Sequence, residues 1–397
     1  MNVVFQEGVL SDIARVTMGQ SPKKEFVSST QEGLPLLNGP TEFGSSHPTP
    51  VQWSTSFSKT AEPGDILFCV RGSTTGRMNW ADQQYAIGRG IASISAINPQ
   101  ERHFVRAAID LVLPELLAAA TGSTFPNVSR LQLSELPVAL PSAAVRTEIS
   151  GLLGALDDKI ESNLRVRNLC RDLGGNLVAD TVRSAPSTQL EHYAVSISRG
   201  VTPQYYKDED ASPVLVLNQK CIRDGWVTPE LARLMIPRAR EKSQAIARLD
   251  DLLVNSTGQG TLGRVARWDS DDPIYVDSHV TVVKADPRRI YPVLMPYLVF
   301  PLQDEIEHMA TGSTGQTELS PSRLAQLNVP LLSLEEQRPL SARLVALEAQ
   351  AHYCQVQSLK LTELRDALLP ELMSGRMRVD EAGCLVSEAL DKEVADV

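Results

Sequence analysis

The sequence repeats itself at long range, and this repeat constrains the fold more than any other feature. The pentapeptide Ala-Thr-Gly-Ser-Thr occurs at residues 120–124 and again at 310–314. Each copy is followed by a similar stretch that begins with Ser-Arg-Leu and reaches a proline, at 129–138 and 322–331. A chance pentapeptide would not have matching neighbours in the same order. We therefore interpret the chain as two copies of a unit of about 190 residues, which is far longer than a solenoid repeat.

The match between the two copies continues upstream of the pentapeptide. The run GDILF at 64–68 corresponds to LDDLLV at 249–254, and Gly76-Arg77 corresponds to Gly263-Arg264. Both copies contain apolar, β-branched runs of strand length next to loops of Gly, Ser and Thr, with helical pieces between them. This pattern predicts an α+β fold for the body of each copy.

Each copy ends in a long segment whose apolar residues recur at steps of mostly three and four. That spacing predicts an amphipathic helix over about 145–182 and a second helix that ends near Pro370 or Gly375. A helix of about 38 residues is roughly 57 Å long, so one small domain cannot cover it. We expect the helices to pair as an antiparallel coiled coil, although each could instead pack only on its own domain. The predicted pairing residues are Ile149, Leu153, Leu156, Ile160, Leu340, Leu344, Leu347 and Leu361.

The predicted architecture is α+β, with two similar domains, each followed by a long helix, related by an internal pseudo-two-fold duplication. The stretch from Asp380 holds six acidic residues and one lysine, so we expect a disordered tail there. The predicted segments are a first domain at 1–141, a helix at 142–184, a second domain at 185–332, a helix at 333–379 and the tail at 380–397.

Composition restricts the class of protein. The five cysteines are scattered without a C-x-x-C pair, which argues against a disulfide framework or a zinc site and fits a reducing cytoplasm. No run of about 18 apolar residues and no signal-peptide pattern occurs. The net charge of −10 requires any DNA-binding face to be a local basic surface. A basic stretch, equally well interpreted as a solvated helix face, contains Arg233, Arg238, Arg240, Lys242 and Arg248.

No catalytic constellation can be assembled from the sequence. Gly258, Gly260 and Gly263 match a dinucleotide-binding fingerprint, but the residues that follow do not form an amphipathic helix, so the match is weak. We interpret the acidic run LDDKIE at 156–161 as the solvated face of the long helix. The histidines lack metal-ligand spacing. We interpret His279 as a residue on the face of a strand, with contact to a DNA base as the alternative.

Polar loops follow apolar strands at matching places in the two copies. Small hydroxyl and amide side chains beside an arginine suit hydrogen bonding to base edges and phosphates, although they also suit an ordinary turn. The candidate DNA-contact residues are Arg71, Ser73, Thr74, Thr75 and Arg77 in the first copy and Ser256, Thr257, Gln259, Thr261 and Arg264 in the second.

Taken together, the chain resembles the specificity subunits of type I restriction-modification systems. The resemblance rests on PGDILFCVRGSTTGR at 63–77, YAIGRGIASI at 85–94, TGSTFPNVSRLQLSELPVALP at 121–141 and ISGLLGALDDKIESN at 149–163, with their echoes in the second half. One departure is that the first helix lacks the acidic-Gln pair that the second keeps as Glu336-Gln337. We therefore expect the first helix to be capped or docked differently.

The resemblance implies a non-catalytic DNA-binding subunit of a cytoplasmic phage-defence complex. Each domain would read one half of a split target, and the helices would act as a spacer and as a dock for two methyltransferase subunits, which restriction subunits can join. S-adenosylmethionine and ATP would bind to those partners and not to this chain. The resemblance extends the expected DNA contacts to Arg89, Ser123, Thr124, Lys220, Ser313 and Thr314.

Three alternatives remain open at this point. The chain could be a coiled-coil scaffold that does not bind DNA, or a similar module of another methyltransferase-based defence system. It could also be a methyltransferase with unrecognised motifs, but the sequence lacks an Asn/Asp-Pro-Pro-aromatic tetrapeptide.

Overall fold

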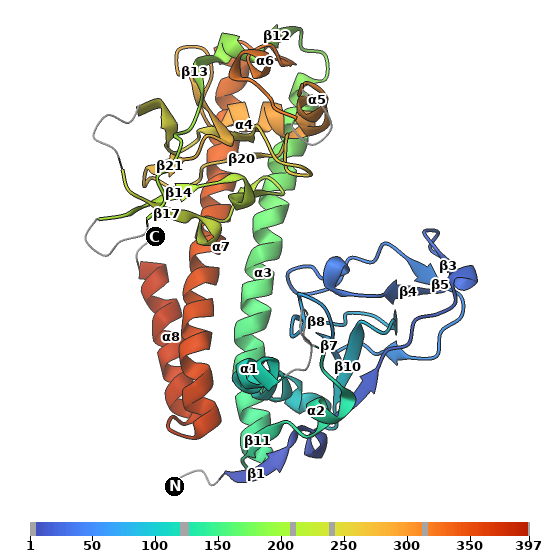
Figure 1. The fold of residues 1–397 in the computed structure, drawn as a ribbon. Helices are drawn as coiled ribbons and strands as arrows, with labels where there is room; N and C mark the ends of the chain where they lie inside the picture. Colours follow the sequence, from blue (N-terminus) through green and yellow to red (C-terminus); the bar gives the residue numbers. More distant parts are fainter. Residues whose placement is uncertain (1–4, 120–126, 207–211, 238–242, 312–316, 396–397) are drawn as a thin grey trace. The chain divides into compact units, whose positions relative to one another are not determined.

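The computed structural model describes residues 5–119, 127–206, 212–237, 243–311 and 317–395 (Figure 1). The chain divides into two compact units. Unit 1 comprises Met1–Leu164 and Val356–Val397, and unit 2 comprises Arg165–Gln355. Two long helices, α3 (Ala143–Val182) and α7 (Leu334–Ser374), each contribute one part to each unit.

Unit 1 contains a four-stranded antiparallel sheet in the order β2-β10-β7-β8 and a five-stranded mixed sheet in the order β3-β5-β4-β9-β6, and β1 pairs with β11. The strands of the first sheet are β2 (Ala14–Met18), β7 (Ile66–Cys69), β8 (Met78–Trp80) and β10 (Ile91–Ala96). The others are β1 (Gln6–Val9), β3 (Val27–Ser28), β4 (Leu34–Leu37), β5 (Trp53–Ser54), β6 (Thr60–Ala61), β9 (Tyr85–Ile87) and β11 (Pro137–Leu140). The helices before α3 are α1 (Arg102–Ala119) and α2 (Arg130–Ser134).

Unit 2 contains the corresponding sheets, in the orders β13-β22-β19-β20 and β17-β14-β21-β18, together with the pairs β12-β23 and β15-β16. The strands of the first sheet are β13 (Ala194–Arg199), β19 (Leu252–Asn255), β20 (Val265–Arg267) and β22 (Val280–Ala285). The others are β12 (Ser187–Gln189), β14 (Val214–Leu217), β15 (Ile222–Arg223), β16 (Trp226–Val227), β17 (Arg233–Met235), β18 (Ile246–Ala247), β21 (Ile274–Val276) and β23 (Asn328–Pro330). The helices are α4 (Leu294–Val299), α5 (Gln303–His308) and α6 (Pro321–Leu324).

The duplication extends to individual hydrogen bonds. In the four-stranded sheet of each unit, counted along the chain, the first strand pairs with the last, the last with the second and the second with the third. Just beyond this second strand (β7 or β19), Val70 N donates to Gly90 O at 3.0 Å in unit 1, and Ser256 N donates to His279 O at 2.8 Å in unit 2. The two copies therefore share a backbone on which matched positions can be identified.

The turn before β7 and before β19 requires a left-handed backbone. Gly64 has a φ of 89°, and its counterpart Asp250 has a φ of 68°. Glycine adopts this region freely, and aspartate is among the few other residues that tolerate it. The next side chain, Asp65 or Asp251, accepts a hydrogen bond from the backbone N–H three residues earlier, at 2.9 and 2.8 Å. The same turn is thus built from two different sequences.

The helices α3 and α7 run antiparallel within unit 1. Arg365 Nη1 donates to Asp157 Oδ1 at 2.9 Å, and Asn163 Nδ2 donates to Gln357 Oε1 at 2.9 Å. Rising numbers on α3 therefore meet falling numbers on α7. The predicted antiparallel pairing is confirmed for this part of the helices.

Unit 2 has the same helix arrangement. Arg167 of α3 binds the side-chain oxygen of Gln355 on α7, and further along α3 Arg171 lies 3.5 Å from Glu348. Six of the predicted pairing residues are buried and two are half-buried; the buried ones are Ile149, Leu153, Leu156, Leu340, Leu344 and Leu361, and the half-buried ones are Ile160 and Leu347. Several of them also belong to the hydrophobic core of their own unit. The helices therefore pair with each other and also pack on the domain of their unit.

The first helix is docked by an ion pair. Arg146 Nε donates to Glu101 Oε2 at 2.6 Å, and its Nη1 donates to Pro141 O at 2.9 Å. Only 3 % of the Glu101 side chain is exposed, so this charge depends on Arg146 for compensation. The first helix, which lacks the acidic-Gln pair, is therefore attached to its domain by an ion pair, which is the different attachment that we expected there.

The second helix is docked by a neutral amide at the matching position. Gln337 Nε2 donates to Arg289 O at 3.0 Å and to Leu332 O at 2.9 Å, and Gln337 is fully buried. Glu336 and Ser333 form a capping box, in which each side chain binds the backbone N–H of the other. The lowered pKa of the Glu336 carboxyl follows from its hydrogen bonds to Ser333.

The prediction of a disordered tail from residue 380 is wrong. The segment forms helix α8 (Val379–Ala395), and Figure 1 shows it alongside the C-terminal part of α7. Ala382 is fully buried in the core of unit 1, and Val379 and Val386 pack against that core. These residues lie at helical steps of three and four, a short apolar stripe that the high content of acidic residues concealed. The break before α8 is at Gly375, with a φ of 72°, whereas Pro370 lies inside α7.

Candidate nucleic-acid interface

Loop 71–77 joins β7 to β8 in unit 1 and presents the predicted polar residues in different ways. Arg71, Ser73 and Thr74 are exposed. Thr75 is 9 % exposed and donates to Gly72 O at 2.8 Å, so it stabilises the turn. Arg77 Nη1 and Nη2 donate to the carbonyl oxygens of residues 40 and 43 at 3.2 and 2.9 Å. Arg77 therefore braces a neighbouring loop.

A second loop of unit 1 lies next to the start of loop 71–77. The hydrogen bond from Val70 to Gly90 joins the two loops, so Arg71 and Arg89 both lie next to this bond in sequence. Both side chains are exposed. Two arginines on neighbouring loops form the kind of local basic surface that an acidic chain needs for DNA binding.

In unit 2, three loops come together at the corresponding end of the sheets. Asn255 Nδ2 donates to Gln219 O at 2.9 Å, which fixes loop 218–220 to the end of β19. Thr257 Oγ1 lies 2.7 Å from His279 Nδ1 and 3.3 Å from Gln219 Oε1. Lys220 and Gln259 are exposed beside this group. The structure thus assembles a polar surface from segments that are far apart in the sequence.

Three residues of this set are placed differently from the prediction. Ser256 is fully buried and lies 2.5 Å from Thr281 Oγ1, so the prediction that its side chain contacts DNA is wrong. Thr261 Oγ1 donates to Thr257 O at 3.4 Å, and Arg264 Nη2 donates to Gly260 O at 2.8 Å. The glycines of this loop leave its backbone conformationally free. These side-chain bonds to backbone oxygens restrain the loop conformation.

His279 was interpreted as a residue on the face of a strand, with contact to a DNA base as the alternative, and the first interpretation is wrong. It lies in the turn between β21 and β22, is exposed, and does not lie on the face of a strand. The glycine fingerprint at 258–263 occupies the hairpin between β19 and β20, where no helix N-terminus follows it, so it is not a dinucleotide site. The dipeptide Ser-His between two strands gave the only sequence signal for this turn.

Some predicted residues lie outside the described part of the chain. They are Ser123, Thr124, Ser313 and Thr314 of the repeated pentapeptide, and Arg238, Arg240 and Lys242 of the basic stretch. Arg233 of that stretch is described, and its guanidinium lies 3.5 Å from the centre of the Tyr205 ring.

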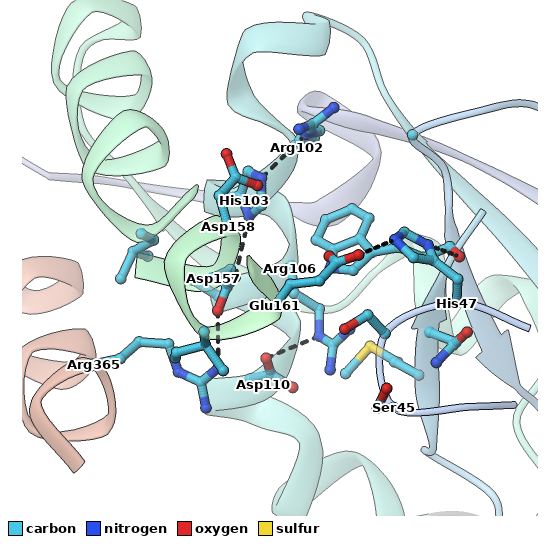
Figure 2. Close-up of a pocket in the computed structure, with 18 of the residues that line it drawn as sticks. Ser45, His47, Arg102, His103, Arg106, Asp110, Asp157, Asp158, Glu161 and Arg365 are labelled. Atoms are coloured by element: carbon cyan, nitrogen blue, oxygen red, sulfur yellow. Dashed lines mark hydrogen bonds and ion pairs between the residues drawn. The ribbon is translucent and has the colours of Figure 1, made fainter. Parts of the chain in front are cut away.

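Unit 1 also contains a polar cavity of about 810 Å³ between the sheet domain and the helices. Figure 2 shows His103 and Asp157 pointing toward one another within it. Arg102 Nε donates to His103 Nε2, so Nδ1 carries the hydrogen and donates to Asp157 Oδ2 at 3.2 Å. His47 Nε2 lies 3.1 Å from Glu161 Oε1. Asp157 and Glu161 are therefore not simply solvated residues, because they bind side chains of the sheet domain.

The carboxylates of this cavity respond differently to their surroundings. Burial alone would raise the pKa of Asp157, but hydrogen bonds from His103 and Arg365 hold it below its usual value. Burial raises the pKa of Asp110, and Arg106 only partly offsets this effect. Asp110, Asp157 and Glu161 each have a basic partner, Arg106, His103 and His47 respectively. Among the described residues no group of three His, Cys, Asp or Glu side chains could hold a metal ion.

Comparison with known proteins shows a similarity in the N-terminal part of the chain. Residues 2–168 match the family model described as type I restriction modification DNA specificity domain. A stretch of 148 residues is 31 % identical to a protein of Methanocaldococcus jannaschii named as a type I restriction enzyme specificity subunit; it covers 37 % of this chain and 35 % of that protein. The N-terminal part of the chain is therefore similar to a type I restriction modification DNA specificity domain, and the chain spans about a third of the length of this relative.

A solved structure extends the likeness in fold to nearly the whole chain. The S subunit of the type I restriction-modification system from M. genitalium superposes with a TM-score of 0.58 over 94 % of this chain and 96 % of that chain, at 17 % sequence identity. The expected α+β architecture with long helices is thereby confirmed. No helix in the described residues is long and apolar enough to cross a membrane.

Proposed function

We propose that the chain is the non-catalytic DNA-binding subunit of a type I restriction-modification complex and reads a target in two parts. The observation that carries this proposal is the pair of matched loop surfaces. The two units share strand order and backbone hydrogen bonds, yet at matched loop ends unit 1 presents Arg71 and unit 2 presents Thr257. Arg71 is exposed and Thr257 is half-buried, and two similar frameworks with different side chains at these loop ends suit two different half-sites.

The paired helices supply a surface for the proposed methyltransferase partners. In unit 2, Leu169 and Leu173 of α3 are 56 % and 49 % exposed, and Val345 of α7 is 56 % exposed. Exposed aliphatic residues one helical turn apart suit packing against a partner helix. S-adenosylmethionine and ATP would bind to the methyltransferase and restriction subunits, which would carry out the chemistry.

The proposal is tested by selection from a random pool of duplex DNA, with the full chain alone and together with its methyltransferase. We expect enrichment of a target with two specified parts separated by an unspecified spacer. We also expect no transfer of label from S-adenosylmethionine to DNA by the chain alone. A single uninterrupted target would contradict the two-part model, labelled DNA without a partner would identify a methyltransferase, and absence of any enrichment would favour a scaffold.

A further inference from the structure

The backbone of His279 is fixed at two points. Its N–H donates to Asp277 Oδ1 at 2.9 Å, and its carbonyl oxygen accepts from Ser256 N at 2.8 Å. Asp277 is itself 1 % exposed, and its N–H donates to Leu217 O at 2.9 Å. An exposed histidine in a turn would ordinarily be mobile, but this one is tied to the ends of two buried strands.

The imidazole ring is fixed at a third point. Thr257 Oγ1 lies 2.7 Å from Nδ1, closer than the 3.3 Å between Thr257 Oγ1 and Gln219 Oε1. Thr257 Oγ1 donates its single hydrogen to Gln219 Oε1, which can only accept, so Nδ1 carries the imidazole hydrogen, donates to Thr257 Oγ1 and leaves Nε2 as an acceptor. Nε2 has no hydrogen-bond partner among the described residues, and the side chain is exposed.

The fold does not require a side chain at position 279. The matching position in unit 1 is Gly90, which accepts the equivalent backbone bond from Val70 at 3.0 Å. A Cβ atom at Gly90 would lie 2.2 Å from Asn38 O, so unit 1 excludes any side chain there. The ring of His279 is thus an addition to a turn that forms without it.

We propose that His279 reads a base edge in the half-site bound by unit 2, with Thr257 as the residue that positions its ring. This inference rests on the proposed function. An acceptor at Nε2 matches the amino groups that cytosine and adenine present in the major groove, whereas the polar atoms of guanine and thymine there are acceptors. The wild-type chain therefore disfavours guanine and thymine at one position. Because the ring is already immobilised, little conformational entropy is lost on contact.

The comparison of the two units also identifies the residue of unit 1 that corresponds in position to Thr257. Thr257 follows Ser256 as Arg71 follows Val70, so Arg71 occupies the matching place next to Gly90. An arginine without a neighbouring ring can donate two hydrogen bonds to guanine. The two units thus carry different readers at one place in a common backbone.

The test is selection of bound duplexes from a randomised pool by the full chain with its methyltransferase, for the wild type and for His279→Ala. We expect the bias against guanine and thymine to relax by about tenfold at one position of one half-site, with the other half-site unchanged. Thr257→Val should relax the same position by a smaller factor, because the ring remains but loses its anchor. His352→Ala is the matched control, since His352 is an exposed histidine of the same unit on helix α7.

The outcomes separate this inference from the proposed function. If the wild type selects a two-part target and His279→Ala selects the same target with the same bias, the inference is overturned and the function stands. A uniform loss of binding to all sequences would also overturn it, because that is the effect of a structural role. If the wild type shows no sequence preference, both the inference and the proposed function are refuted. Should His279→Ala fail to fold, the Thr257→Val selection decides the question.

Discussion

Glu348 is the centre of a buried charge network in unit 2, and its removal should destabilise that unit strongly. Only 4 % of its side chain is exposed. Arg267 Nη1 donates to one carboxylate oxygen at 2.9 Å, and Tyr297 donates to the other at 2.5 Å. Arg171 lies 3.5 Å from the same carboxylate. The network joins α7 to α3 and to the sheet domain within unit 2.

The expected cost of Glu348→Ala follows from the partners that remain. Removing one member of a buried ion pair costs about 3–5 kcal/mol, because the other charge stays buried without compensation. Arg267 keeps an ion pair with Asp250 at 2.6 Å, which places the expected loss near the lower end, about 3 kcal/mol. Arg171 keeps its bond to Gly225 O at 2.7 Å and its stacking on Trp226, 3.7 Å from the ring centre.

The loss can be measured by chemical and thermal unfolding. A loss of about 3 kcal/mol in a unit of this size lowers Tm by roughly 6–12 °C. Glu348→Gln keeps the shape of the side chain but removes its charge, so its loss should be smaller. The matched control is Glu363→Ala, an exposed glutamate on the same helix, which should change stability by less than about 0.5 kcal/mol. If Glu348→Ala and Glu363→Ala shift the unfolding transition equally, the network does not stabilise unit 2.

Three further changes probe unit 1, each followed by urea unfolding. The pKa of Asp157 is lowered in the folded protein, so the ionised carboxylate stabilises the fold above its unfolded pKa near 4. This contribution is lost as the pH falls through the folded pKa. The difference in unfolding free energy between wild type and Asp157→Asn should therefore shrink from pH 7 to pH 3. Arg146→Ala should cost about 3 kcal/mol because Glu101 stays buried, and adding Glu101→Gln should restore much of that loss. A stop codon in place of Val379 should remove about 2–4 kcal/mol, because Ala382 and its neighbours cover the core; unchanged unfolding would show that α8 is dispensable.

The sequence predicted those parts of the fold that depend on repeated pattern. The pairing of α3 with α7 follows from apolar residues at helical spacing, and Leu153 and Leu344 are buried as expected. The correspondence of Gly76-Arg77 with Gly263-Arg264 also holds, since both glycines have a positive φ, 90° and 84°. These features are local or periodic, so a single sequence contains them.

Features that depend on distant partners could not be predicted. Asp157 reads as a solvated helix residue until His103, far away in the sequence, is placed beside it. Burial of Ser256 could not be recognised, because a serine after an apolar strand is equally common in an exposed turn. The helix α8 was concealed by its acidic residues, although Val379, Ala382 and Val386 carry its packing.

The comparison of the two units separates residues that the fold requires from residues that it leaves free. Asp65 and Asp251 are the same residue in both copies because their carboxylates close the same turn. Arg71 and Thr257 differ although they follow the same backbone hydrogen bond, because no buried group depends on either side chain. A change of side chain at such a loop end alters what the surface can recognise without altering strand register. Two half-sites can therefore diverge on one framework, and the substitutions that change a target are expected at these loop ends rather than in the sheets.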